Sequence, residues 1–284
     1  MSVELATPTH HREVPFMNDA LVRLGWNDAL AGSFHAHRLL GRSPARVVAV
    51  HKETAIVRGL HGDQRAVVSG RFRFEAVSPA DYPAVGDWVA LESATELLGE
   101  HGATVSAATH GAAVIAALLP RRSAFRRTAG DASRRGGGRL EDEQVLAANV
   151  DVALIVAGLD GDFNLRRIER YLTVAWSSGA RPVVLLNKAD LADELDASRD
   201  AVQAIAPGVP VETLSALTGA GLAAVGRHVR ARETAVVLGS SGVGKSTLVQ
   251  RPARGRAPGD PRGPRCRLAR SPHHHASRAV RPAR

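Results

Sequence analysis

The chain has 284 residues, and 44% of them are hydrophobic, which is enough apolar material for more than one packed domain. This excludes a chain that is disordered throughout. No apolar run reaches the about 18 residues of a membrane span, and the first 16 residues lack the basic-then-apolar order of a secretory signal. The only cysteine, Cys266, permits neither an intrachain disulfide nor a cysteine-built zinc site. We therefore expect a cytoplasmic protein without a membrane partner.

The formal net charge of +9 is concentrated at one end of the chain. Residues 251–284 contain ten arginines and one acid, and the remaining 27 basic and 27 acidic side chains leave residues 1–250 neutral. The overall charge is thus a property of the tail and does not by itself indicate a nucleic-acid-binding body.

The first two segments are predicted to be an N-terminal extension, residues 1–38, and a barrel, residues 39–120. The extension has one short amphipathic stretch over residues 19–30, whose apolar side is formed by Leu21, Leu24 and Trp26. The next segment breaks into short β-like runs separated by Gly, Asp and Pro. These runs are 45–51, 54–60, 65–75, 85–92, 104–108 and 112–120. Five or six short strands in this span favour an OB-fold-like barrel.

Residues 121–143 are predicted to be an arginine- and glycine-rich linker. Residues 121–139 contain seven arginines, one acid and a glycine triplet, so they can bury little apolar surface. A solvated, mobile connection is the simplest interpretation, and a contact with RNA phosphates is the alternative.

Residues 144–250 change to an alternation of strands and helices. Apolar strands are expected at 150–158, 181–187 and around 235–239, and a helix is expected to begin at Asn164 and to stop at Gly179. This alternation predicts a doubly wound α/β sheet, whose ligand loops gather at the carboxyl ends of parallel strands.

The segment G-S-S-G-V-G-K-S at residues 239–246 satisfies the G-x-x-x-x-G-K-[ST] motif between a strand and a helix. Such a loop turns backbone N–H groups towards phosphate oxygens, and the helix start adds partial positive charge. We predict that Lys245 is the catalytic cation at the β- and γ-phosphates and that the Ser246 hydroxyl binds Mg²⁺. The alternative is a glycine-serine turn that happens to precede a helix. The predicted phosphate-binding residues are Gly239, Ser240, Ser241, Gly242, Val243, Gly244, Lys245, Ser246 and Thr247.

A second motif, N-K-A-D at residues 187–190, ends another predicted strand. N-K-x-D in this position is typical of the recognition loop of GTP-binding proteins. Asp190 would accept two N–H groups of guanine, Asn187 would brace the neighbouring loop, and the stem of Lys188 would cover the base, with Ala189 between them. The alternative is that Asp190 caps the helix that follows.

A third turn, S-A-L-T-G-A-G at residues 215–221, also follows a strand. Ser215 and Ala216 fit the loop whose backbone N–H meets the guanine carbonyl, although a helix-capping turn explains the segment equally well. The phosphate motif follows the two guanine loops instead of preceding them. Because all three loops leave one edge of a parallel sheet, this order predicts a circularly permuted GTPase domain.

Residues 38–250 resemble the small ribosomal subunit-dependent GTPase A family, circularly permuted GTPases of bacterial ribosome assembly. After an OB-like module, the likeness rests on R-R-S-A-F-R-R, Q-V-L-A-A-N-V-D, I-E-R-Y-L, N-K-A-D, S-A-L-T-G-A-G and G-S-S-G-V-G-K-S-T in this order. The resemblance implies hydrolysis of GTP, with Mg²⁺, stimulated by the 30S subunit during its late maturation, and contacts with 16S rRNA. It also implies a zinc-binding helical domain, whose ligands we do not find in this chain.

The resemblance ends after Gln250. Residues 251–284 hold six of the fifteen prolines and are predicted to be disordered. One interpretation is a frameshift: with suitable third bases, the DNA for residues 270–279 read one nucleotide later encodes G-R-H-T-T-T-H-R-E-L, which matches the family's switch segment. The alternatives are an arginine-rich RNA-binding arm and a metal site at residues 273–275.

The tail contains neither a G-R-H-T-T-T switch nor a D-T-P-G strand end. We therefore expect an incomplete GTPase domain at residues 144–250, weak or absent hydrolysis, and an exposed apolar sheet edge at residues 235–239. Two other functions stay open: a non-enzymatic rRNA-binding protein that uses the barrel and the arginine-rich segments, and a P-loop ATPase.

Overall fold

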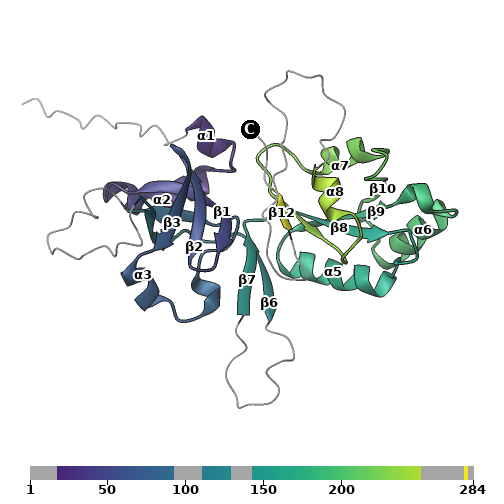
Figure 1. The fold of residues 1–284 in the computed structure, drawn as a ribbon, viewed down its shortest axis with the longest axis horizontal. Helices are drawn as coiled ribbons and strands as arrows, with labels where there is room; N and C mark the ends of the chain where they lie inside the picture. The colour runs from purple at the N-terminus through teal and green to yellow at the C-terminus, as the bar shows by residue number, and fades with distance from the viewer. Residues whose placement is uncertain (1–17, 93–110, 129–142, 251–277, 281–284) are drawn as a thin grey trace, which may run out of the picture.

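The computed structural model describes residues 18–92, 111–128, 143–250 and 278–280. Figure 1 shows a barrel at one end, a sheet flanked by helices at the other, and a two-stranded hairpin between them. The predicted α/β class, with a barrel followed by a doubly wound sheet, is confirmed. Within these ranges no helix has the length and apolar character needed to cross a membrane.

Two short helices, α1 (Asp19–Val22) and α2 (Asp28–Leu39), precede the barrel. Each begins after an asparagine whose side-chain oxygen accepts a backbone N–H of the first turn. The amphipathic stretch predicted over residues 19–30 spans both helices, and Gly25, at φ +95°, turns the chain between them. The three apolar side chains expected on this segment, Leu21, Leu24 and Trp26, are all buried, and they pack against residues of the barrel.

The barrel is closed by five strands in the order β1-β2-β3-β5-β4. Their bounds are β1 (Ser43–His51), β2 (Thr54–Gly59), β3 (Gly62–Val68), β4 (Trp88–Leu91) and β5 (Ala113–Leu118). Inward-facing side chains such as Val47, Val57 and Ile115 form its core. The β-like run expected at 104–108 lies outside the described residues.

The strand predicted over residues 65–75 is wrong in its second half. Strand β3 ends at Val68, and the sequence G-R-F-R-F-E forms helix α3 (Gly70–Glu75), which is followed by η1 (Pro79–Asp81). Alternating Arg and Phe have the period of a strand, but the Ser69 hydroxyl accepts the Phe72 amide N–H at 3.1 Å and starts a helix. Local capping, and not burial, therefore decides this element.

The predicted linker is ordered wherever it is described. Strand β6 (Ala124–Thr128) pairs antiparallel with β7 (Glu143–Ala148) to form the hairpin. The Arg121 guanidinium donates to both carboxylate oxygens of buried Asp87, at 2.8 and 2.7 Å, and Phe125 is buried. Within this segment Ser123 and Phe125 are buried and Arg121 is paired with Asp87, whereas Arg122 and Arg126 are exposed, so a solvated connection does not describe residues 121, 123 and 125. Residues 129–142 lie outside the described ranges.

The second body is a five-stranded sheet in the order β10-β9-β8-β11-β12. Strands β8 (Val152–Gly158), β9 (Arg181–Asn187), β10 (Val211–Thr213) and β11 (Ala235–Leu238) are parallel. Every residue of β8 is buried, as a strand covered on both faces requires.

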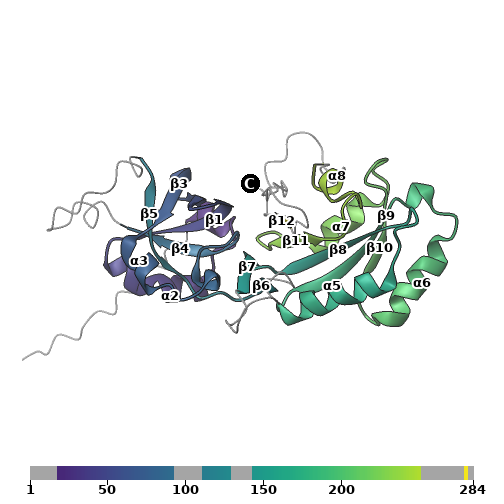
Figure 2. The same ribbon diagram turned by 60° about the horizontal axis from the view of Figure 1, so that its bottom comes forward.

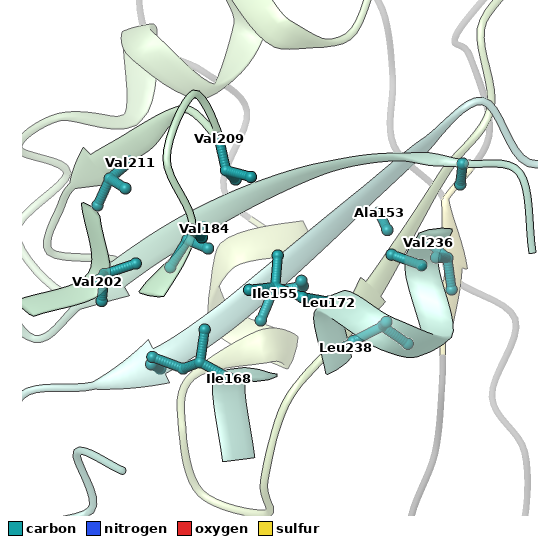
Figure 3. Close-up of a cluster of buried hydrophobic side chains, with 14 of the residues drawn as sticks. Ala153, Ile155, Ile168, Leu172, Val184, Val202, Val209, Val211, Val236 and Leu238 are labelled. Atoms are coloured by element: carbon teal, nitrogen blue, oxygen red, sulfur yellow. The ribbon is translucent and has the colours of Figure 1, made fainter. Parts of the chain in front are cut away.

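Two apolar clusters hold helices on opposite faces of this sheet (Figure 2). On one face, α5 (Leu165–Ser177) and α6 (Leu195–Ile205) contribute Ile168 and Val202, which pack near Ile155 of β8 (Figure 3). On the other face lie α7 (Leu222–His228) and α8 (Lys245–Gln250). With both faces covered, the loops at the carboxyl ends of the strands form the edge at which ligands bind.

Strand β12 (Arg278–Val280) overturns the expectation of an exposed edge at β11. It pairs antiparallel with β11, with Ala235 opposite Val280 and Val237 opposite Arg278. The expectation of disorder throughout the tail is therefore wrong for residues 278–280. Residues 251–277, including the histidine triplet and most of the segment that suggested a frameshift, lie outside the described residues.

Candidate nucleotide-binding site

The phosphate motif connects β11 to α8, as the sequence predicts. Two of its glycines are required by their surroundings. A Cβ on Gly239 would lie 2.5 Å from the carbonyl oxygen of Val156, and one on Gly244 would lie 2.3 Å from the Asn187 side-chain nitrogen. Both glycines also have positive φ, at +151° and +97°. The loop can thus approach β8 and the N-K-A-D segment only because these positions carry no side chain.

The side chain of Lys245 folds back over the start of the phosphate loop. It donates a hydrogen bond to the Gly239 carbonyl oxygen at 2.8 Å and another to the Ser240 carbonyl oxygen. Ser246 and Thr247, at the start of α8, are exposed. The loop therefore carries a cation over its glycine turn and a hydroxyl oxygen at the helix start, which are the groups that phosphate and Mg²⁺ prefer.

Asn187 joins the three predicted loops. Its side chain is 2% exposed; its Nδ2 donates to the Val243 carbonyl oxygen at 2.7 Å, and its Oδ1 accepts the Ala216 amide N–H at 2.8 Å. One amide side chain thereby links the strand end at residue 187 to both the phosphate loop and the 215–221 turn. This is the position that the sequence predicts for Asn187, beside a neighbouring loop.

The rest of the N-K-A-D motif also faces this edge. Ala189 donates its amide N–H to the Leu214 carbonyl oxygen at 3.1 Å, which gives a second link between the two guanine loops. Asp190 lies in the short helix η3 (Ala189–Leu191) and is exposed. Helix α6 begins later, with Glu194 at its N-cap. The alternative in which Asp190 caps that helix is therefore excluded.

The 215–221 turn combines a structural and a site role. The Ser215 hydroxyl accepts the Thr218 amide N–H at 3.1 Å, as in a helix-entry turn. Ser215 and Ala216 belong to the loop expected to meet a guanine carbonyl through a backbone N–H. The Ala216 N–H donates to Asn187 Oδ1 and so links this turn to the N-K-A-D loop.

Sequence reasoning missed two carboxylates, Asp160 and Asp162, in the loop that follows β8. Asp160 forms an ion pair with the Lys188 ammonium. Asp162 accepts hydrogen bonds from Arg167 at 2.7 Å and from the Ser240 hydroxyl at 2.5 Å. These contacts lower the pKa of both acids, that of Asp160 chiefly through Lys188 and that of Asp162 chiefly through Arg167. Their place directly after a buried strand was the available signal.

This edge of the sheet therefore brings together the glycine-rich loop that carries Lys245, the exposed carboxylate of Asp190, and the buried Asn187 side chain, which links the loops. Such an arrangement suits a phosphorylated purine, whose anionic oxygens would lie at the 239–246 loop and whose base would form hydrogen bonds near Asp190. Over the part of the chain that the structure describes, no group of three or more His, Cys, Asp or Glu side chains could hold a metal ion. A cation here would depend on the Ser246 oxygen and on the phosphates themselves.

Comparison with known proteins matches this arrangement. Residues 118–255 match the family model described as RsgA GTPase. The chain is 45% identical over 231 residues to the small ribosomal subunit biogenesis GTPase RsgA of Opitutus terrae, covering 81% of this chain and 60% of that protein. The RsgA of Syntrophotalea carbinolica is 42% identical, covering 81% and 59%. The chain thus spans about three fifths of the length of these relatives.

Two solved structures share the fold. YjeQ from Thermotoga maritima aligns with a TM-score of 0.52 at 23% identity, covering 73% of this chain and 64% of that one. YloQ, described as a circularly permuted GTPase, aligns with a TM-score of 0.50 at 19% identity, covering 80% and 67%. The order of loops in this chain is accordingly that of a circularly permuted GTPase fold.

Proposed function

Through residues 118–255 the chain belongs to the RsgA GTPase family, and we propose on this basis that it binds GTP and hydrolyses it during maturation of the small ribosomal subunit. The observation that carries the proposal is the pair of hydrogen bonds made by Asn187. A single amide holds the phosphate loop and both guanine loops in one place, which a fortuitous glycine turn would not require.

In this function the phosphate loop binds the β- and γ-phosphates. Its backbone N–H groups surround the phosphate oxygens, and the Lys245 ammonium, now on the Gly239 carbonyl oxygen, exchanges that partner for a phosphate oxygen. The Ser246 hydroxyl would hold Mg²⁺, and the ion would supply positive charge against the phosphates. Lys245 stabilises the charge that develops as water attacks the γ-phosphate.

Guanine selection is assigned to Asp190. Its carboxylate is exposed and accepts no side-chain hydrogen bond within the described residues, so both oxygens are available to the two N–H donors of guanine. Adenine presents a mismatched pattern at the same edge. The N-K-A-D loop therefore favours GTP over ATP.

The partner that we propose is the small ribosomal subunit, including its 16S rRNA, and the location is the cytoplasm. Support comes from the relatives, which are named as small ribosomal subunit biogenesis GTPases. The barrel is the second supporting feature, because small closed barrels of this class often bind oligonucleotides. Zinc has no role in this proposal.

The decisive experiment compares nucleotides and then ribosomal subunits. The full chain should bind fluorescent GDP and GTP in the presence of Mg²⁺ at least tenfold more tightly than ADP and ATP, and Asp190→Asn should reduce this preference. Asp193→Asn, a change of an exposed acid three residues later, is the matched control. Cosedimentation with purified 30S subunits, with and without a non-hydrolysable GTP analogue, tests the partner. Equal binding of adenine and guanine nucleotides would instead indicate an ATPase.

A further inference from the structure

Asp160 contacts a residue of the guanine loop without belonging to any of the three motifs. Its carboxylate forms an ion pair with the Lys188 ammonium, and the two side chains are 27% and 26% exposed. Asp160 is an exposed residue, so the pair lies at the protein surface, where water and salt reach it. It is the one side-chain hydrogen bond of the Lys188 ammonium within the described residues.

Lys188 needs such a partner if its stem is to cover a base. Its backbone is already held in the left-handed region, at φ +66°, which directs the start of the side chain. The four-carbon stem beyond that point has many rotamers, and fixing them at the moment of binding costs free energy. A partner for the ammonium in the free protein removes part of this cost.

The position of Asp160 is itself fixed by the fold. The neighbouring Leu159 donates its amide N–H to the Asn187 carbonyl oxygen at 2.9 Å, so this loop is tied to the residue that precedes Lys188. A Cβ on Gly158 would lie 2.6 Å from Asp160 Oδ1, and the absence of a side chain there leaves room for the carboxylate. The loop thus presents the acid in a defined place.

Asp162, two residues later, serves a different loop. It accepts hydrogen bonds from the Ser240 hydroxyl of the phosphate loop and from Arg167, and within the described residues none from Lys188. The two acids of one short loop are therefore divided between the base side and the phosphate side of the site.

We propose that Asp160 is a positioning residue for guanine nucleotides: it holds the Lys188 ammonium so that the aliphatic stem is placed to cover the base before the nucleotide arrives. The inference rests on the proposed GTP-binding function. Asp160 itself touches no phosphate and takes no part in hydrolysis.

The test is a double-mutant cycle on the full chain, with equilibrium affinity for fluorescent GDP as the readout. Asp160→Ala should weaken binding about three- to tenfold, the cost of ordering one long side chain. In the Lys188→Ala background the same change should have no further effect, because its partner is gone. Asp200→Ala, which removes an exposed acid from α6, controls for the loss of charge.

A second readout separates positioning from general damage to the fold. Inorganic pyrophosphate, which competes at the phosphate loop and has no base, should bind Asp160→Ala as tightly as the parent chain. Thermal unfolding should show that the variant is folded. Unchanged or tighter GDP binding by Asp160→Ala, or the same loss in both backgrounds, would overturn the proposal. Failure of the parent chain to bind GDP at all would instead remove the proposed function.

Discussion

The Arg46 guanidinium of the barrel donates a hydrogen bond to the Thr234 hydroxyl, 2.7 Å away, at the entrance to β11. It also donates to the carbonyl oxygens of Leu24, Gly86 (3.2 Å) and Asn149 (3.3 Å). Arg46 is 4% exposed, and burial lowers its pKa to about 10. A desolvated cation that is still charged at neutral pH therefore connects the barrel to the strand that carries the phosphate loop.

Removing this cation should destabilise the connection between the two bodies. Arg46→Ala leaves three acceptors without a donor, leaves the Gly86 carbonyl oxygen with only the Asn149 amide, and opens a cavity in place of the side chain, so the free energy of unfolding should fall by roughly 2–4 kcal/mol. Urea denaturation followed by tryptophan fluorescence measures this, because Trp88 lies under the guanidinium, 5.6 Å from ring centroid to Cζ. Arg170→Ala, on the exposed side of α5, should change stability by less than about 0.5 kcal/mol. A similar loss in both variants would contradict the assignment.

Asn187→Ala should weaken nucleotide binding strongly and should also lower the free energy of unfolding. The change leaves the Val243 carbonyl oxygen and the Ala216 N–H unpaired in a buried place, which costs about 1–3 kcal/mol for each group, and it releases the two loops from one another. We expect GDP affinity to fall at least a hundredfold by isothermal titration calorimetry.

Asn164→Ala is the control for this variant. It removes another asparagine with a structural hydrogen bond, the N-cap of α5, and should cost about 1 kcal/mol of stability. Its GDP affinity should equal that of the parent chain. If Asn187→Ala behaves in the same way, Asn187 does not organise the site.

Gly244→Ala should abolish nucleotide binding for a steric reason. The added Cβ would lie 2.3 Å from Asn187 Nδ2, and residue 244 has φ +97°. Gly208→Ala tests backbone strain alone, because Gly208 has φ +81° and no atom within 4 Å of an added Cβ. It should cost about 1 kcal/mol of stability and leave GDP binding intact. Retained GDP binding by Gly244→Ala would show that the loop does not depend on this close approach.

The Asp160–Lys188 pair predicts a specific pH dependence. The hydrogen bond from Lys188 lowers the pKa of Asp160 below its usual value of 3.8. Because the pKa is lower in the folded than in the unfolded chain, the stabilisation is complete above about pH 4 and is lost as the pH falls through the folded-state pKa.

NMR titration of the Asp160 carboxyl carbon checks this shift. In Lys188→Ala the pKa of Asp160 should rise towards 3.8, while that of Asp162, which is lowered mainly by Arg167, should move little. An Asp160 pKa that is the same in the parent and in the variant would show that the ion pair does not form in solution.

Much of the fold and of the site was predictable because the signals are local. The glycines of the 239–246 loop, the acid at 190 and the turn at 215 each follow an apolar strand, and parallel strands bring their carboxyl ends to one edge. Helix α5 likewise begins after Asn164 and ends before Gly179, as capping rules predict. By contrast, R-F-R-F at residues 71–74 has the period of a strand, and its helix follows from a single hydroxyl cap at Ser69.

The amino-acid sequence by itself determined which loops carry phosphate- and guanine-binding chemistry and in what order, because a short motif specifies its own backbone geometry. Only the tertiary structure decided which atoms meet. Asn187 reaches partners 56 and 29 residues away, Asp160 reaches Lys188 across 28 residues, and Arg46 reaches Thr234 across 188. Contacts at such separations depend on how strands, barrel and hairpin pack together, and no local pattern of residues encodes that packing.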